Sequence, residues 1–180
     1  MERFFLASIL IFAFIAIMHA EGKELQVVPA VDLPRYQGKW YEIARLPNRF
    51  QQQCVGNVAA SYTLRQDGRI TVINECRLRD GSTDRAEGVA RVADSKGPNS
   101  KLKVRFAPAF LSFLPFVWGD YWILDLAPDY SYVLVGDPGR KYFWILARTP
   151  QISERTYEQL VEKARAQGFA VDRLIRTRQD

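Results

Sequence analysis

The sequence predicts an all-β fold, an eight-stranded antiparallel up-and-down β-barrel with one C-terminal α-helix packed on its outside. Short strand-like runs follow one another, tight turns separate them, and one helix-period stretch comes after the last run. The dipeptides Asp67-Gly68 and Asp80-Gly81 are strong hairpin signals between alternating runs. Because hairpins join consecutive runs, a barrel without free edges is favoured over a sandwich, which is the structural alternative.

Each strand-like run is expected to form one strand of the barrel. Most of the connections between the runs are short, and no helix-period stretch interrupts them. The runs span residues 39–46, 57–65, 69–78, 83–93, 101–107, 120–127, 130–136 and 141–149.

The helix that follows the strands has clear start and stop signals. Ser153 is a good N-cap, and Ile152 and Tyr157 stand where a hydrophobic staple would place them. Gly168 suits the position just after the last turn. An apolar stripe at helical spacing is expected to pack on the barrel, and it consists of Tyr157, Leu160, Val161 and Ala164.

The N-terminal segment has the features of a secretory signal peptide, residues 1–20. A charged start precedes an apolar run from residue 4 to residue 18, and Ala20 offers a small residue for cleavage. A retained membrane anchor is the alternative, but the run is short for a span of roughly 20 residues. We expect residues 21–31 to form an N-terminal extension and residues 32–180 to form the single domain.

The signal peptide also contains the only histidine of the chain, His19. The mature protein therefore lacks the commonest general base and the commonest metal ligand, so we expect no enzyme, no metal and no cofactor. No cysteine that could accept a lipid anchor follows the apolar run. We expect an exported protein, periplasmic or extracellular, with association with the outer membrane left open.

The composition is that of a folded domain. Hydrophobic residues make up 48% and charged residues 25%, and the net charge is +5. Because the lysines and arginines are scattered, the sequence does not predict a nucleic-acid partner, which would need a clustered basic face.

Three short motifs make the chain resemble a lipocalin, over roughly residues 32–178. "GKWYE", with Gly38 and Trp40, resembles the family's G-x-W motif. "APDYSYVLV" resembles the second motif around Asp129 and Tyr130, with a proline where threonine is common, and "WILART" resembles the third, with Arg148. The wording is most similar to the branch that contains bacterial lipocalins and apolipoprotein D. The resemblance implies that Arg148 lies across the Trp40 ring at the closed end, as a structural lid.

Counting loops from this closed end gives the positions of the two cysteines. Successive loops alternate between the ends of an up-and-down barrel, so the segments around Cys54 and Cys76 both fall at the open end. Exported chains with two cysteines usually pair them, and a Cys54–Cys76 disulfide is geometrically reasonable.

Alternation along the strands predicts which side chains line a ligand cavity. The resemblance points to Tyr62, Asn74, Phe106, Tyr121 and Trp144, and alternation agrees for all but Tyr121, which rests on alignment only. Leu78 stands where a relative has a basic pocket residue, so the head-group preference does not carry over. The alternative is a barrel packed solid by its aromatics. Further residues assigned to the cavity are Val58, Ala60, Val72, Val104 and Tyr142.

The connection "APAFLSFLPFVWG", residues 107–119, is apolar and uncharged. Loop counting places it at the open end, where it would contact a membrane, fold inward as a lid, or form a dimer interface. Its large apolar side chains are Phe110, Leu111, Phe113, Leu114, Phe116 and Trp118.

These features predict a binding protein for small hydrophobic ligands such as fatty acids or lysophospholipids, serving storage, transport or envelope maintenance. One alternative is a protein–protein interaction module that uses the 107–119 loop. The other is a lipocalin-type enzyme, which would need a free cysteine thiolate in the pocket.

Overall fold

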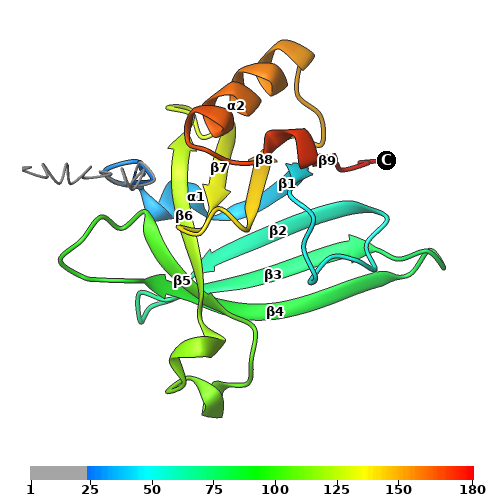
Figure 1. Cartoon of the computed structure of the whole chain (residues 1–180). Helices are drawn as coiled ribbons and strands as arrows, with labels where there is room; N and C mark the ends of the chain where they lie inside the picture. The colour runs from blue at the N-terminus through cyan, green and yellow to red at the C-terminus, as the bar shows by residue number, and fades with distance from the viewer. Residues whose placement is uncertain (1–23) are drawn as a thin grey trace, which may run out of the picture.

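The computed structural model describes residues 24–180, which form a closed barrel of antiparallel strands (Figure 1). β1 pairs with β2 on one side and with β8 on the other, so the sheet closes on itself and the sandwich is excluded. The predicted eight-stranded barrel is therefore confirmed. Its strands are β1 (Gly38–Arg45), β2 (Gly56–Leu64), β3 (Ile70–Arg77), β4 (Thr83–Val92), β5 (Lys101–Arg105), β6 (Gly119–Leu126), β7 (Tyr132–Gly136) and β8 (Phe143–Ala147).

The connections divide between two ends of the barrel, as strand alternation requires. The closed end holds the turns after β2, β4 and β6, together with the short helix α1 (Leu33–Tyr36) just before β1. The open end holds the connections after β1, β3, β5 and β7.

A seam between β1 and β2 at the open end is filled by the C-terminal segment. β1 pairs with β2 only from Gly38 to Tyr41, and a short strand β9 (Ile175–Arg176) pairs with its far end. Beyond β9, the Gln179 side-chain amide donates to the carbonyl oxygens of Glu42 and Val58, each at 2.8 Å. The segment thus bridges two strands that do not reach each other there, which local sequence patterns did not predict.

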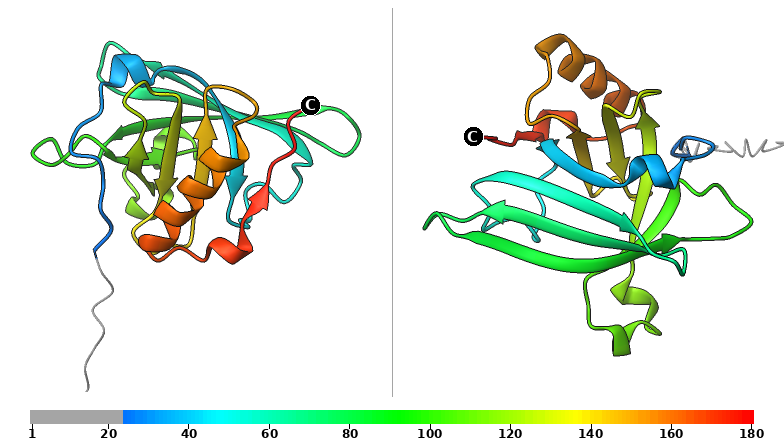
Figure 2. Two further views of the ribbon diagram at one scale, coloured as in Figure 1. Left: turned by 90° about the horizontal axis from the view of Figure 1, so that it is seen from above. Right: turned by 180° about the vertical axis from the view of Figure 1, so that it is seen from behind.

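Two apolar cores lie on either side of the barrel wall. The inner core contains Trp40, Tyr62 and Val135. The outer core lies between the barrel and the helix α2 (Glu154–Ala166), and Phe143 and Leu160 are buried in it. Figure 2 shows α2 along the outside of the barrel, as predicted.

The predicted signals of α2 are present in the structure. The Ser153 side chain accepts a hydrogen bond from the Thr156 amide, and Gly168 has φ +84° just after the helix. Ile152 and Tyr157 both pack on the outer core. The helix boundaries therefore follow from local sequence.

The segment before α1 is packed against the barrel. Leu25 and Val31 are buried, and the Val28 amide donates to the Ile123 carbonyl oxygen at 3.0 Å. Residues 25–31 thus run along the wall of the barrel. The predicted signal peptide, residues 1–20, lies outside the described residues. Within residues 24–180, no helix has the length and apolarity that a membrane crossing needs.

Candidate ligand-binding site

Trp40 closes one end of the barrel. It is fully buried, and its indole Nε1 donates to the Tyr36 carbonyl oxygen at 2.9 Å. The Arg148 guanidinium carbon lies 3.9 Å from the ring centroid, and its two terminal nitrogens donate to the carbonyl oxygens of Lys39 (3.0 Å) and Arg35 (2.7 Å). Arg148 is therefore held over the indole ring, as the family resemblance implies.

Gly38 is needed for this closure. Its φ is +92°, which side chains of L-residues rarely adopt, and a Cβ there would lie 3.3 Å from Arg148 Nη1. The glycine of the first motif thus makes room for the arginine of the third.

The second motif ties the turn after β6 to α1. The Asp129 carboxylate accepts a hydrogen bond from the Ser131 amide at 3.0 Å, and hydrogen bonds from Ser131 lower the pKa of this carboxyl. The Tyr130 hydroxyl accepts from the Asp32 amide at 2.9 Å, and the Arg35 guanidinium carbon lies 4.1 Å from the Tyr130 ring centroid. Both motif residues therefore support the closed end.

Three tyrosines form the floor above Trp40. The Tyr121 hydroxyl lies 2.8 Å from the Tyr36 hydroxyl and 2.9 Å from the Tyr62 hydroxyl. Burial raises the pKa of Tyr62 to about 12 and the pKa values of Tyr36 and Tyr121 well above their usual range, so all three stay protonated at neutral pH. The two hydrogen bonds link the three hydroxyls into one network at the floor.

The wall above the floor is built from small side chains on β2 and β4. Two rows of register partners cross β2, β3 and β4 on the inner face. Ala60 pairs with Asn74, which pairs with Ala86, and Tyr62 pairs with Val72, which pairs with Gly88. Small residues at these positions leave space that larger ones would fill.

Gly88 also accommodates a neighbouring ring. A Cβ on Gly88 would lie 2.7 Å from the Phe106 ring, so the missing side chain lets Phe106 lie against the wall. Phe106 is 43% exposed and follows directly after β5, at the open end of the barrel.

Aromatic side chains line the mouth on the opposite wall. The Tyr142 and Trp144 rings stack with centroids 6.1 Å apart, and Phe50 lies 5.7 Å from Tyr142. The Trp144 indole nitrogen donates to Gln51 Oε1 at 2.9 Å. The 46–55 connection is therefore attached to the rim by its own side chains.

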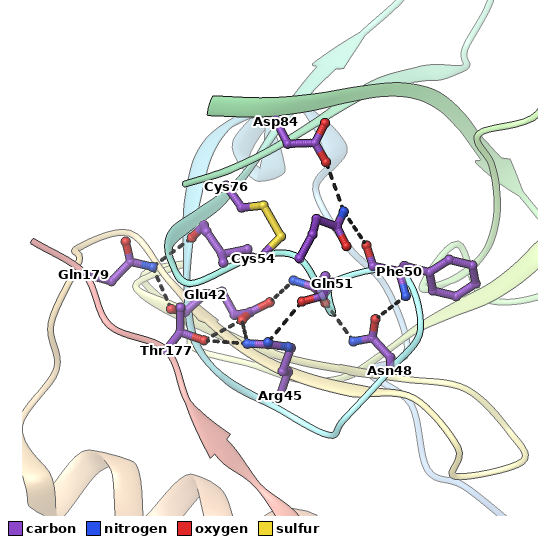
Figure 3. The surroundings of a disulfide bond; sticks show 12 residues. Glu42, Arg45, Asn48, Phe50, Gln51, Cys54, Cys76, Asp84, Thr177 and Gln179 are labelled. Carbon is purple, nitrogen blue, oxygen red and sulfur yellow. Dashed lines mark hydrogen bonds and ion pairs between the residues drawn. A yellow bond between two sulfur atoms is a disulfide. The ribbon is translucent and has the colours of Figure 1, made fainter. Parts of the chain in front are cut away.

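A buried charged cluster lies beside this rim (Figure 3). Glu42 is 2% exposed and accepts from Arg45 Nη1 at 2.9 Å, from Gln51 Nε2 at 2.6 Å and from the Thr177 hydroxyl. Arg45 is 8% exposed, and its Nε has no partner among the described residues. The sequence analysis did not predict this cluster. The available signal was that Glu42 lies two residues after the buried Trp40 and therefore on the same face of the strand.

The predicted disulfide is present in the structure. Cys54 and Cys76 are bonded, with Cα atoms 5.6 Å apart. The Val55 amide also donates to the Arg77 carbonyl oxygen at 2.8 Å. The bond thus joins the 46–55 connection to the end of β3 at the open end.

A family model described as a lipocalin-like domain matches residues 31–179. The chain belongs to the lipocalin family. Temperature-induced lipocalin-1 of Arabidopsis thaliana is 48% identical to it over 160 residues, which cover 88% of this chain and 85% of that protein. The outer membrane lipoprotein Blc of Escherichia coli (strain K12) is 39% identical over 83% of this chain and 80% of its own length.

More distant matches agree with this assignment. Apolipoprotein D of Mus musculus is 31% identical over 82% of this lipocalin and 77% of its own length. The solved structure of insecticyanin from the tobacco hornworm Manduca sexta has a TM-score of 0.64 at 20% identity, covering 87% of this chain and 85% of that one. The last comparison concerns the fold alone.

The residues predicted to line a ligand cavity lie at different depths in the barrel. Tyr62 and Tyr121 form the floor, while Asn74, although exposed, shares the inner face of β3 with Val72. Val58 is buried beside the seam, next to a register shift in β2. The interior apolar cluster also includes Ala60, Val72, Val104 and Trp144.

The 107–119 loop projects away from the barrel on the side opposite α2 (Figures 1 and 2). It contains two short 3-10 helices, η1 (Ala109–Leu111) and η2 (Pro115–Val117). Three side chains at its tip, Phe110, Phe113 and Phe116, are 74%, 77% and 79% exposed. Of the three placements left open for this loop, the inward-folded lid is not the one seen in this structure, because the apolar tip points into solvent.

The other large side chains of the loop lie nearer the protein. Leu111, Leu114 and Trp118 are half-buried. Trp118 stands at the root of the loop, where its indole nitrogen donates to the Ser112 carbonyl oxygen at 2.8 Å. The predicted six-residue apolar surface is thus a tip of three phenylalanines on a partly packed base.

The described residues contain no cluster of side chains that could bind a metal ion. Between residues 24 and 180, no group of three or more His, Cys, Asp or Glu side chains could hold a metal ion. A hollow of about 560 Å³ lies outside the barrel along α2, beside Arg155, Glu158 and Lys163.

Proposed function

We propose that this lipocalin is an exported lipid-binding protein that holds a fatty acid, a lysophospholipid or a similar small hydrophobic ligand in its barrel. Its role would be storage, transport or envelope maintenance. The observation that carries the proposal is the inner wall, which is apolar and aromatic, has small residues at mid-depth, and becomes solvent-exposed at Phe106 and Asn74. An apolar cavity with a few polar groups suits a lipid tail with a polar head.

The distribution of polar groups supports a defined orientation. Ala60, Val72 and Val104 surround the middle of the barrel and would contact an acyl chain. At the mouth, the exposed Asn74 amide would face acceptor atoms of a head group.

Export and membrane contact are supported by separate features. A disulfide persists in oxidising compartments outside the cytosol, and the relative from Escherichia coli is described as an outer membrane lipoprotein. The exposed phenylalanines belong to the same end of the barrel as Phe106. A membrane contacted by this loop would therefore face the mouth and could exchange lipid with it.

Native mass spectrometry of the protein exported into a bacterial periplasm tests the proposal, followed by denaturing extraction. We expect a stoichiometric adduct that releases a fatty acid or lysolipid. Ala60→Trp, which fills the inner wall, should abolish the adduct. Ser61→Trp, which places the same indole on the outer face of β2, should retain it. A barrel without adduct after added lipid, in the wild type and in both variants, would contradict the proposal.

Two rival functions have their own tests. An interaction module or homodimer built on the 107–119 loop would lose its partner in Phe113→Glu/Phe116→Glu, seen as a change in mass by light scattering, while lipid binding persisted. Thiolate catalysis would need a free cysteine, and both cysteines are bonded to each other. A titratable thiol in the oxidised protein would reopen that alternative.

A further inference from the structure

We propose that Arg91 and Arg105, which flank Trp118 at the root of the 107–119 loop, bind the phosphate groups of anionic phospholipids. The protein would then dock preferentially on anionic bilayers, with the phenylalanine tip inserted. This inference rests on the membrane contact proposed above and names its lipid chemistry.

Two guanidinium groups converge on one indole. The Arg91 guanidinium carbon lies 4.3 Å from the Trp118 ring centroid, and that of Arg105 lies 5.2 Å from it. Both arginines are on the outer face of the barrel, because their neighbours Ala90 and Val104 belong to the inner core. Cation–π contacts hold the two charges beside the loop rather than in free solution.

These two arginines have no carboxylate partner among the described residues. Arg105 is only 7% exposed, donates to the Ala107 carbonyl oxygen, and leaves its Nε without a partner. The adjacent Lys103, by contrast, is paired with Asp120 at 2.7 Å. Arg91 is exposed and can meet an external anion directly, while the buried charge of Arg105, which lacks a counter-ion, adds to the attraction from the other side of Trp118.

The loop itself is suited to insertion. Its amides at Leu111, Ser112, Leu114, Val117 and Trp118 each donate to the carbonyl oxygen three residues earlier. A segment entering hydrocarbon must satisfy its backbone groups internally, and these turns satisfy five of the loop's amides without a long helix.

The order of side chains along the loop matches the layers of a bilayer surface. The exposed phenylalanines form the tip, Trp118 lies behind them, and the arginines lie at the base. Aromatic residues such as tryptophan favour the interface, and basic residues favour anionic head groups. Insertion of the tip would therefore bring Arg91 and Arg105 to the level of the phosphates.

Vesicle flotation tests this inference. We would compare vesicles of phosphatidylcholine alone with vesicles that also contain phosphatidylglycerol, at low salt and at physiological salt. The wild type should bind the anionic vesicles at least about tenfold more tightly, and the preference should weaken with salt. Equal binding to the two vesicle types would overturn the site.

Matched variants separate the site from the overall charge. Arg91→Gln/Arg105→Gln should reduce binding to anionic vesicles by about tenfold or more, with little change on neutral ones. Arg155→Gln/Arg173→Gln removes the same charge from α2 and η3 (Val171–Arg173), on the opposite side, and should retain the preference. An equal loss in both double variants would overturn the proposal in favour of general electrostatics.

Single variants guard against misfolding. If the Arg105 variant fails to fold, Arg91→Gln compared with Arg155→Gln decides, with about a fivefold loss expected for the former only. Binding of a fluorescent fatty acid without vesicles is measured in parallel. A wild type that shows no preference between the two vesicle types but binds the fatty acid would overturn this inference alone, whereas a wild type that binds no fatty acid would contradict the proposed function.

Discussion

At the closed end of the barrel Trp40 is fully buried, whereas Phe113 at the open end is 77% exposed. The indole is covered on one side by the Arg148 guanidinium and satisfied by the Tyr36 carbonyl oxygen. No such cover exists for the phenylalanine in the part of the chain that the structure describes. The same kind of side chain thus stabilises the fold at one end and is available to a partner at the other.

The two ends of the barrel also differ in how far their buried polar groups are satisfied by hydrogen bonds. At the floor, the hydroxyls of Tyr36, Tyr62 and Tyr121 bond to one another. Two buried side-chain nitrogens without a hydrogen-bond partner are described, Arg45 Nε and Arg105 Nε, and both lie toward the open end. The exposed apolar tip and the buried nitrogens without a partner therefore both belong to the open end.

The strongest way to break the comparison is to remove the closed-end indole. Trp40→Ala should lower the free energy of unfolding by about 3–5 kcal/mol, since it leaves a cavity under Arg148. Urea unfolding measures the change. Phe113→Ala deletes an aromatic ring at the open end and is the control. Equal losses in the two variants would contradict the contrast between the ends.

Removing the disulfide tests how the open end is held. Cys54→Ala/Cys76→Ala releases a link across 22 residues and should cost about 3 kcal/mol in free energy of unfolding. Reduction of the wild type by dithiothreitol should cause a similar loss. If reduced and oxidised proteins unfold at the same urea concentration, the bond does not stabilise this end.

The tyrosine floor predicts alkaline instability. Because burial raises the pKa of Tyr62 from 10.0 to about 12, the folded state holds this proton more tightly than the unfolded state. Its stability contribution is complete below pH 10 and falls as the pH rises toward 12, by about 2 kcal/mol.

Tyr62→Phe isolates that effect. At neutral pH the variant should lose about 1 kcal/mol, because one hydrogen bond to Tyr121 is removed. Between pH 10 and 12 its free energy of unfolding should decline less steeply than that of the wild type. Urea titrations at several pH values measure both, and an unchanged slope would contradict the role assigned to this hydroxyl.

The smallest effect on stability is expected at the exposed loop tip of the open end. Phe113→Ser should change the free energy of unfolding by no more than about 0.5 kcal/mol, since the ring is exposed. Binding to vesicles should nevertheless fall. A marked loss of stability in urea would show that the loop packs elsewhere in solution.

Much of the site could be predicted because it depends on neighbours along the chain. Alternation on β2 and β3 indicated that Tyr62 and Val72 face inward, and both belong to the inner core. Tyr121, on a strand apolar on both faces, required the family resemblance. Alternation predicts the face on which a side chain lies but not its depth in the barrel. The exposure of Asn74 therefore follows only from the three-dimensional structure.

The sequence by itself determined the strands, their hairpin order, the helix caps and the end at which Cys54 and Cys76 meet, because turns, alternation and caps act over a few residues. Only the tertiary structure decided that Gln179 bridges β1 and β2, that Glu42 and Arg45 form a buried pair with Thr177, and that the phenylalanine tip points outward. Such contacts join segments more than 100 residues apart or depend on what lies opposite, and neither is written in a local pattern.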